Sequence, residues 1–147
     1  MPWYGDVSQV LSSKRLSPFR GKVTLQKCIL IVDDSQTIRT AVRNFLECQP
    51  TFTVCGEAVD GFDALEKVLS LSPDLIILDL SMPRMNGLQT ARELRARLIP
   101  VPIILFTMYA EELQPQDVAT SGISAVVSKT NLPVLQLQIE RLLVAAS

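Results

Sequence analysis

The stretch that decides the fold is Cys28-Ile-Leu-Ile-Val-Asp-Asp-Ser35, a short apolar run that ends in two carboxylates and a hydroxyl. A continuous apolar run of this length is typical of a strand that is buried on both faces of a parallel sheet. Apolar residues then recur at helical spacing, with Ser35 where an N-cap is expected and Pro50 beyond the helix end. One buried strand followed by one amphipathic helix is the repeating unit of an α/β fold.

The same unit recurs along the rest of the chain. Strand patterns cover Phe52–Ala58, Leu75–Leu78, Pro102–Phe106 and Ser124–Val127, and helical patterns cover about Gly61–Leu71, Leu88–Leu98, Glu111–Thr120 and Leu132–Val144. Pro115 falls inside the first turns of the third of these helices. Strands that alternate with helices imply right-handed crossovers and a parallel sheet covered on both faces. We therefore predict five β–α repeats over residues 28–147.

The composition indicates one globular domain and excludes several kinds of catalytic and metal site. The chain has 147 residues, 48% of them hydrophobic, which is enough for one globular domain. It contains no histidine, which excludes Ser-His-Asp and Cys-His triads, HExxH zinc sites and phosphate carried on its own histidine. Its three cysteines, Cys28, Cys48 and Cys55, show no CxxC spacing, so we expect buried free thiols. With no signal peptide and no membrane-length apolar run, a cytoplasmic location is predicted.

Residues 1–27 differ from the rest of the chain. They carry five Lys/Arg and one Asp, whereas residues 28–147 carry nine Lys/Arg and fourteen Asp/Glu. Their apolar residues follow neither the helical nor the strand spacing for long, and Ser, Pro and Gly residues that favour turns interrupt them. We predict a poorly ordered N-terminal extension over residues 1–27, with one short helical turn around Val7–Leu11, followed by the domain at 28–147.

Polar residues follow four of the predicted strands at the point where each strand ends: Asp33 and Asp34, Asp79, Thr107 and Lys129. Ligands bind at the carboxyl ends of the strands in open parallel sheets, so these groups should meet at one edge. Any one aspartate there could simply cap a helix. Five such groups together are better explained by a site.

The chemistry of this set favours phosphoryl transfer. Close carboxylates repel one another, and Mg²⁺ relieves that repulsion because it prefers carboxylates, waters and phosphate oxygens. No GxxxxGK[ST] or GxGxxG loop is present, so the phosphate is not held as a nucleotide in a glycine-rich loop. The nucleophile that remains is a carboxylate, which forms an acyl phosphate.

These residues stand in motifs that resemble a known family. The motifs are Val32-Asp-Asp-Ser35, Leu78-Asp-Leu-Ser-Met-Pro83 with Met85-Asn-Gly87, Phe106-Thr-Met108 and Ser128-Lys129. Together they resemble the receiver domain of two-component response regulators, over residues 28 to about 144. The resemblance implies a flavodoxin-like (βα)5 doubly wound parallel sheet with strand order 2-1-3-4-5.

The resemblance also implies roles for the site residues. Asp79 would be the phosphoacceptor, supplied by a sensor histidine kinase or histidine phosphotransfer protein. Asp34 would bind Mg²⁺ directly, Asp33 would bind it through water, and the Ser81 carbonyl and Asp79 would complete the metal ligands. Lys129 would pair with the carboxylate and then the phosphoryl group. Thr107 would move toward the phosphoryl oxygen. No further enzymatic activity is expected beyond the protein's own phosphorylation and dephosphorylation.

Two positions depart from the family pattern. Val126 occupies the place of the usual aromatic switch residue, three residues before Lys129, and a branched aliphatic side chain cannot swing as a ring does. Tyr109 is the aromatic residue placed to take over part of that role. Thr130 replaces the usual proline after Lys129, so no cis-proline is expected there. Both departures concern how phosphorylation is read out.

Three functions remain open at this point. The leading expectation is a stand-alone phosphoacceptor switch, because the chain ends at Ser147, directly after the last helix. Its partners would be a phosphate donor and an unknown downstream protein, without direct DNA or membrane binding, and a homodimer could form through the last two helices and the strand between them. The alternative is a receiver-fold interaction module that works without phosphorylation. A haloacid-type phosphatase would need DxD, which Asp33-Asp34-Ser35 does not match.

Overall fold

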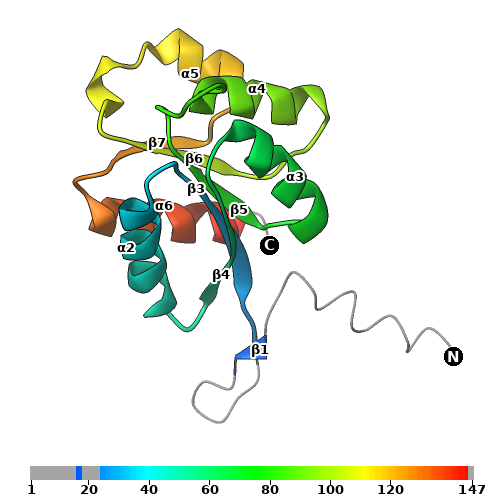
Figure 1. The fold of residues 1–147 in the computed structure, drawn as a ribbon. Helices are drawn as coiled ribbons and strands as arrows, with labels where there is room; N and C mark the ends of the chain where they lie inside the picture. The colour runs from blue at the N-terminus through cyan, green and yellow to red at the C-terminus, as the bar shows by residue number, and fades with distance from the viewer. Residues whose placement is uncertain (1–15, 18–23, 146–147) are drawn as a thin grey trace, which may run out of the picture.

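Five parallel strands form one sheet in the order β4-β3-β5-β6-β7 in this computed structural model, which describes residues 16–17 and 24–145 (Figure 1). The strands are β3 (Lys27–Val32), β4 (Phe52–Ala58), β5 (Leu75–Leu78), β6 (Ile103–Thr107) and β7 (Ala125–Ser128). The helices are α2 (Gln36–Glu47), α3 (Gly61–Leu71), α4 (Gly87–Ala96), α5 (Pro115–Ser121) and α6 (Leu132–Ala145), with a short 3₁₀ helix η3 (Ala110–Glu112) before α5. This is the predicted order 2-1-3-4-5 of a flavodoxin-like sheet.

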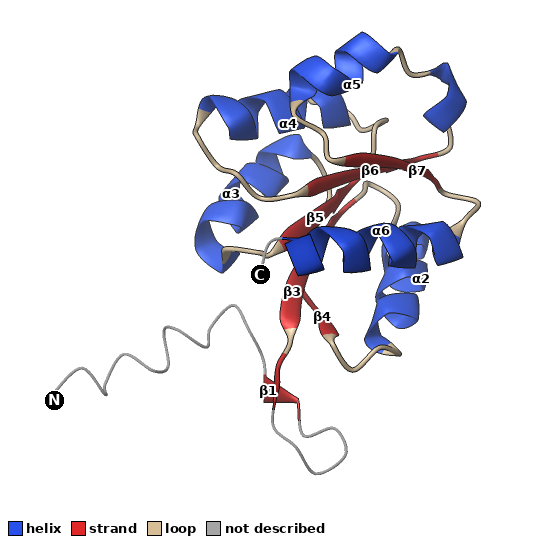
Figure 2. Cartoon of the chain, turned by 180° about the vertical axis from the view of Figure 1, so that it is seen from behind, coloured by secondary structure: helices blue, strands red, loops and turns tan. Residues whose placement is uncertain are grey.

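Helices cover both faces of the sheet, as Figures 1 and 2 show from opposite sides. Alternate residues of β3 divide between two apolar clusters: Ile29 and Ile31 pack with α2 and α6, while Leu30 and Val32 pack with α3 and α4. All four residues of β5 are buried. The sheet is therefore the shared centre of a three-layer core, with its central strands β5 and β6 fully buried and its edge strands β4 and β7 partly exposed.

Polar caps fix where several helices begin. The Ser35 hydroxyl accepts a hydrogen bond from the Ile38 amide at 3.4 Å, which confirms the predicted N-cap of α2. Asn86 caps α4 in a capping box with Gln89. Each cap satisfies amides that have no partner within the helix. Because these caps follow strands of one sheet, they also fix the loops at its carboxyl edge.

The predicted helix at 111–120 differs from the observed structure. Residues Ala110–Glu112 form η3 instead, and α5 begins at Pro115, so this proline is the first helical residue rather than an interior one. Proline suits that position because the first helical residues need no intrahelical N–H bond. It also drives the preceding residue out of helical geometry, and Gln114 is extended. The helix therefore could not continue back to residue 111.

The prediction of three buried free thiols was wrong. Cys28 and Cys55 form a disulfide with their Cα atoms 5.3 Å apart, and the free thiol of Cys48 is exposed. The pairing register runs Ile29 with Val54 and Leu30 with Gly56, so Cys55 is an extra residue in a bulge of β4. The bond joins neighbouring parallel strands, and no short-range cysteine spacing could reveal it.

The N-terminal extension is described only in part. Strands β1 (Leu16–Ser17) and β2 (Thr24–Leu25) pair antiparallel just before β3 begins. The predicted turn at Val7–Leu11 lies outside the described residues, and the division at residue 27 stays a prediction. Within the residues that the structure describes, no helix is long and apolar enough to span a membrane.

Candidate functional site

The carboxyl edge of the sheet brings the predicted aspartates together. Asp33 and Asp34 follow β3, Asp79 follows β5, and one carboxylate oxygen of each lies within 4.8 Å of those of the other two. The Asp79 amide donates to the Val32 carbonyl at 2.9 Å, which extends the pairing of the two strands into the site. Asp33 and Asp79 are almost fully buried, at 2% and 4% exposed, whereas Asp34 is exposed. The site is thus an acidic recess with one carboxylate at its mouth.

Lys129 supplies the positive charge of the recess. Its ammonium lies 2.7 Å from Asp33 Oδ2 and 3.1 Å from Asp79 Oδ1. The Lys129 amide donates to the Thr107 carbonyl at 2.9 Å, which fixes the start of the loop after β7 against the end of β6. Lys129 thus pairs with the Asp79 carboxylate, and Asp33 shares this contact. The sequence did not predict that Asp33 would hold the shorter contact.

Burial sets the ionisation of the recess. Burial raises the pKa of Asp79, the charge of Asp33 raises it further, and Lys129 and the Ser81 amide only partly oppose this. Burial alone would lower the pKa of Lys129, but hydrogen bonds and charges from Asp33 and Asp79 outweigh it, so that pKa is raised. The Lys129 ammonium therefore stays charged. The ionised form of Asp79, in contrast, is less stable here than it would be in water. A cation or a phosphoryl group would relieve that disadvantage.

Thr107 and Tyr109 lie at the carboxyl end of β6, beside the end of β7 that leads to Lys129. Thr107 is fully buried at the end of β6, and its hydroxyl accepts a hydrogen bond from the Tyr109 amide at 3.1 Å. The Tyr109 side chain is 48% exposed beside a cavity of about 300 Å³ that Ser128 also lines. Val126 is half-buried in β7 and packs against the cluster on the α3–α4 face. Among the described residues no peptide bond is cis, so Lys129-Thr130 is trans as predicted.

The loop after Asp79 carries Ser81 and one partner of an ion pair that the sequence analysis missed. The Ser81 amide donates to the Asp79 carboxylate from the loop between β5 and α4. Further along this loop, Arg84 forms an ion pair with Asp60, the N-cap of α3. The only sequence signal for this ion pair was weak: Asp60 stands directly before a helical pattern, where an N-cap is expected. Partners 24 residues apart become visible only once the fold is known.

The residues present fit a hard divalent cation. Three carboxylate oxygens converge, two of them from buried side chains, and oxygen ligands of this kind are those that Mg²⁺ prefers. Lys129 balances only part of the negative charge. The Lys129 ammonium also contacts the Asp79 carboxylate, and the pairing of a carboxylate with a fixed positive charge suits the transfer of a phosphoryl group. The arrangement can therefore bind a cation and present a carboxylate to a phosphorus atom.

Comparisons with known proteins agree with this geometry. The sequence model of the response regulator receiver domain matches residues 29–140. The protein-glutamate methylesterase/protein-glutamine glutaminase of Symbiobacterium thermophilum is 41% identical over 98 residues, which are 67% of this chain and 27% of that protein. The nitrate/nitrite response regulator NarL of Escherichia coli is 42% identical over 93 residues, which are 63% of this chain and 42% of that protein. The chain thus matches less than half the length of these curated relatives.

One solved structure bears on the metal. The response regulator protein TrrA of Thermotoga maritima, solved in complex with Mg²⁺-BeF, superposes with a TM-score of 0.72 at 31% identity. The match covers 80% of this chain and 99% of that chain. A protein of the same fold therefore holds a divalent cation together with a beryllium fluoride.

Proposed function

Because this chain belongs to the receiver domain family of response regulators, we propose that it accepts a phosphoryl group on Asp79 in a two-component phosphorelay. The observation that supports this most strongly is the contact of Lys129 with Asp79 inside a recess of three carboxylates. The proposed phosphate donor is a histidine kinase or a histidine phosphotransfer protein, and the output is a change in contacts with a downstream protein. The proposal keeps the cytoplasmic location that the sequence predicts.

Each residue of the recess has a proposed part in the transfer. An Asp79 oxygen attacks the phosphorus atom, a new P–O bond forms, and the bond to the donor breaks, with its electron pair leaving on the donor. Lys129 stabilises the negative charge of the transferred group, and the Thr107 hydroxyl donates to one of its oxygens. Asp33, Asp34, Asp79 and the Ser81 carbonyl would hold Mg²⁺, which supplies charge neutralisation at the phosphoryl oxygens.

Acetyl phosphate gives a direct test because it needs no partner protein. Intact mass after incubation with acetyl phosphate and Mg²⁺ should increase by one phosphoryl group. The increase should disappear in Asp79→Asn and when a chelator removes the cation. Glu66→Gln is the matched control, because this exposed acid lies on α3 outside the recess and should leave the increase unchanged. A full increase in Asp79→Asn would place the acceptor elsewhere.

A receiver-fold module that works without phosphorylation is the second candidate. Val126 favours it, because this residue provides no aromatic ring to transmit the change at Thr107. The same incubation separates the two functions. A wild-type protein that takes up no phosphate in Mg²⁺ would support the constitutive module.

A further inference from the structure

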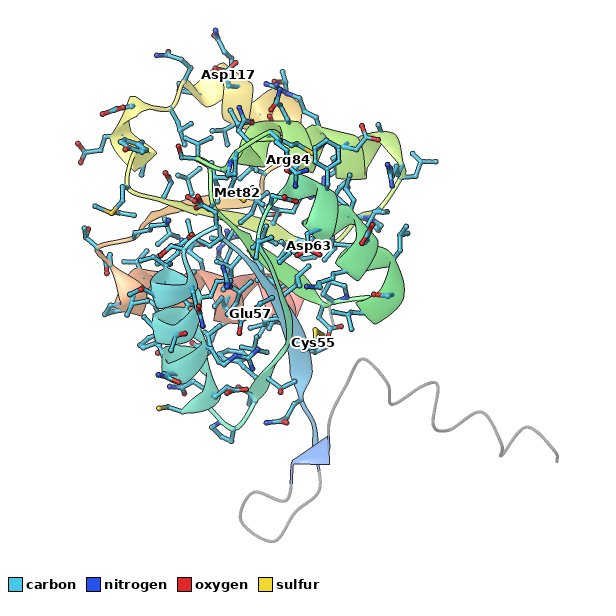
Figure 3. All side chains as sticks on the ribbon, in the orientation of Figure 1. Cys55, Glu57, Asp63, Met82, Arg84 and Asp117 are labelled. Atoms are coloured by element: carbon cyan, nitrogen blue, oxygen red, sulfur yellow. A yellow bond between two sulfur atoms is a disulfide. The ribbon has the colours of Figure 1, made fainter. Side chains whose placement is uncertain are left out.

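Arg84 ties the loop between β5 and α4 to the beginning of α3. Its guanidinium pairs with the Asp60 carboxylate and lies 5.5 Å from the centre of the Phe62 ring. The Asp60 side chain is 7% exposed and that of Arg84 is 68% exposed, so Arg84 covers a buried carboxylate from the solvent side. Figure 3 labels Arg84 in the upper part of the molecule. A planar guanidinium can pair with a carboxylate and stack on a ring at once, which an ammonium does less well.

The backbone of Arg84 adds an independent observation. Its φ angle is +69°, in the left-handed region that disfavours residues with a Cβ atom. Glycine would adopt this conformation without strain. An arginine persists in such a conformation only when surrounding contacts hold it. The ion pair with Asp60 and the contact with Phe62 are the contacts that the structure provides.

The loop held in this way carries groups that face the acceptor. The Ser81 amide donates to the Asp79 carboxylate. At the far end of the loop, the Gly87 amide donates to the Leu80 carbonyl at 2.8 Å. A Cβ atom on Gly87 would lie 2.3 Å from the Asp79 carbonyl oxygen, so this end is fixed by close packing. Arg84 stands between these fixed points and joins the middle of the loop to a different helix.

We propose that Arg84 is a positioning residue for phosphorylation: through Asp60 and Phe62 it holds the loop so that Ser81 faces Asp79 and the cation. This inference rests on the proposed function. Arg84 acts through the loop and makes no contact of its own with the donor. Its loss should loosen residues 80–86, weaken Mg²⁺ binding and slow phosphorylation, while the core stays intact.

Arg84→Gly tests the inference because it removes the side chain and the backbone strain together. Arg84→Lys keeps the charge but loses the planar contact. Arg97→Ala is the matched control, since Arg97 forms an exposed ion pair with Glu93 at the end of α4. Three quantities are measured for each variant: amide exchange of residues 80–86 in metal-free protein, the Mg²⁺ concentration that gives half of the thermal shift, and the phosphorylation rate with acetyl phosphate.

For Arg84→Gly we expect faster exchange at residues 80–86 and about a tenfold higher Mg²⁺ midpoint, the lower end of what loss of outer-shell support costs. The phosphorylation rate below Mg²⁺ saturation should fall by a similar factor, with little change in metal-free melting temperature. Arg84→Lys should be intermediate, and Arg97→Ala should match wild type.

Two results would overturn the inference. One is an unchanged Mg²⁺ midpoint and unchanged exchange in Arg84→Gly. The other is a higher KM for acetyl phosphate at saturating Mg²⁺ with an unchanged Mg²⁺ midpoint, which would mean that Arg84 contacts the donor. Failure of the proposed function is distinct, because wild-type protein would then take up no phosphate at all.

Discussion

The two ends of the sheet differ in chemistry: charged groups gather at the carboxyl end, whereas a disulfide and apolar side chains lie at the amino end. At the carboxyl end, one carboxylate oxygen from each of three aspartates lies within 4.8 Å of the other two, and the pKa of Asp79 is raised. At the amino end, a disulfide joins β3 to β4, and apolar side chains with three prolines line a cavity of about 420 Å³. Figure 3 shows Cys55 toward the lower end, with Met82 and Arg84 toward the upper end.

This difference indicates where stability and function lie in the molecule. Charge repulsion at the carboxyl end lowers stability, and under the proposed function it prepares a carboxylate for phosphoryl transfer. The core and the cross-link at the other end offset that loss. Changes at the amino end should therefore alter stability most, whereas changes at the carboxyl end should alter cation binding and phosphorylation with little loss of stability.

The largest stability effect should come from the disulfide. Reducing it, or making Cys55→Ala, should lower the free energy of unfolding by about 3 kcal/mol, because the bond closes a loop between residues 27 positions apart. Urea unfolding with and without a thiol reductant measures the difference. Cys48→Ser is the control, since Cys48 is exposed and free. Identical unfolding midpoints for oxidised and reduced wild-type protein would show that the disulfide does not stabilise the amino end of the sheet.

At the carboxyl end, Asp34→Ala should separate stability from cation binding. The exposed Asp34 carboxylate can be removed without loss of core packing, and its removal relieves repulsion from Asp33 and Asp79. The metal-free protein should therefore be equally or slightly more stable. Mg²⁺ affinity should fall by about tenfold or more, because loss of even an outer-shell partner of a metal typically costs this much.

Thermal melts across a Mg²⁺ titration measure both quantities for Asp34→Ala. Glu66→Ala removes an exposed acid on α3 as a control and should titrate like wild type. A wild-type Mg²⁺ response in Asp34→Ala would show that the cation does not bind through this carboxylate.

The sequence predicts the regular elements and the meeting of the strand ends at the carboxyl edge. The bounds of β4, β5 and α3 were predicted as observed, because local apolar periodicity and caps determine them. The meeting of Asp33, Asp79 and Lys129 also followed from strand ends in a parallel sheet.

Features that depend on register or on distant partners were missed. The Cys28–Cys55 bond requires the bulge in β4, and the contact of Arg84 with Asp60 requires α3 and the loop to be placed side by side. The boundaries around Pro115 were missed for a local reason, the preference of proline for the first helical position. The spacing of apolar residues therefore predicts the helices, the strands and the points where strands end. Bulges, loops and contacts between distant residues become visible only in the structure.

The smallest effect is expected at β7 and α6. Val126 has no ring to follow Thr107, so binding of beryllofluoride with Mg²⁺ should change amide exchange mainly in the loops after β5 and β6. Exchange in α6 should stay close to that of the free protein. Asp79→Asn, which lacks the proposed acceptor carboxylate, is the control and should show no response. Strong protection across residues 124–144 in wild type would mean that the change is transmitted to α6 despite Val126.

The central claim is that the carboxyl end trades stability for function, and the free energy of unfolding of Asp79→Asn tests it most directly. Burial raises the folded-state pKa of Asp79 above its usual 3.8, so ionisation destabilises the folded state. The loss of stability grows as pH rises from the usual pKa of 3.8 through the raised folded-state pKa. Urea unfolding at neutral pH without metal should therefore show Asp79→Asn to be more stable than wild type. Added Mg²⁺ should stabilise wild type by mass action and narrow that gap. A metal-free variant that is less stable than wild type would contradict the account.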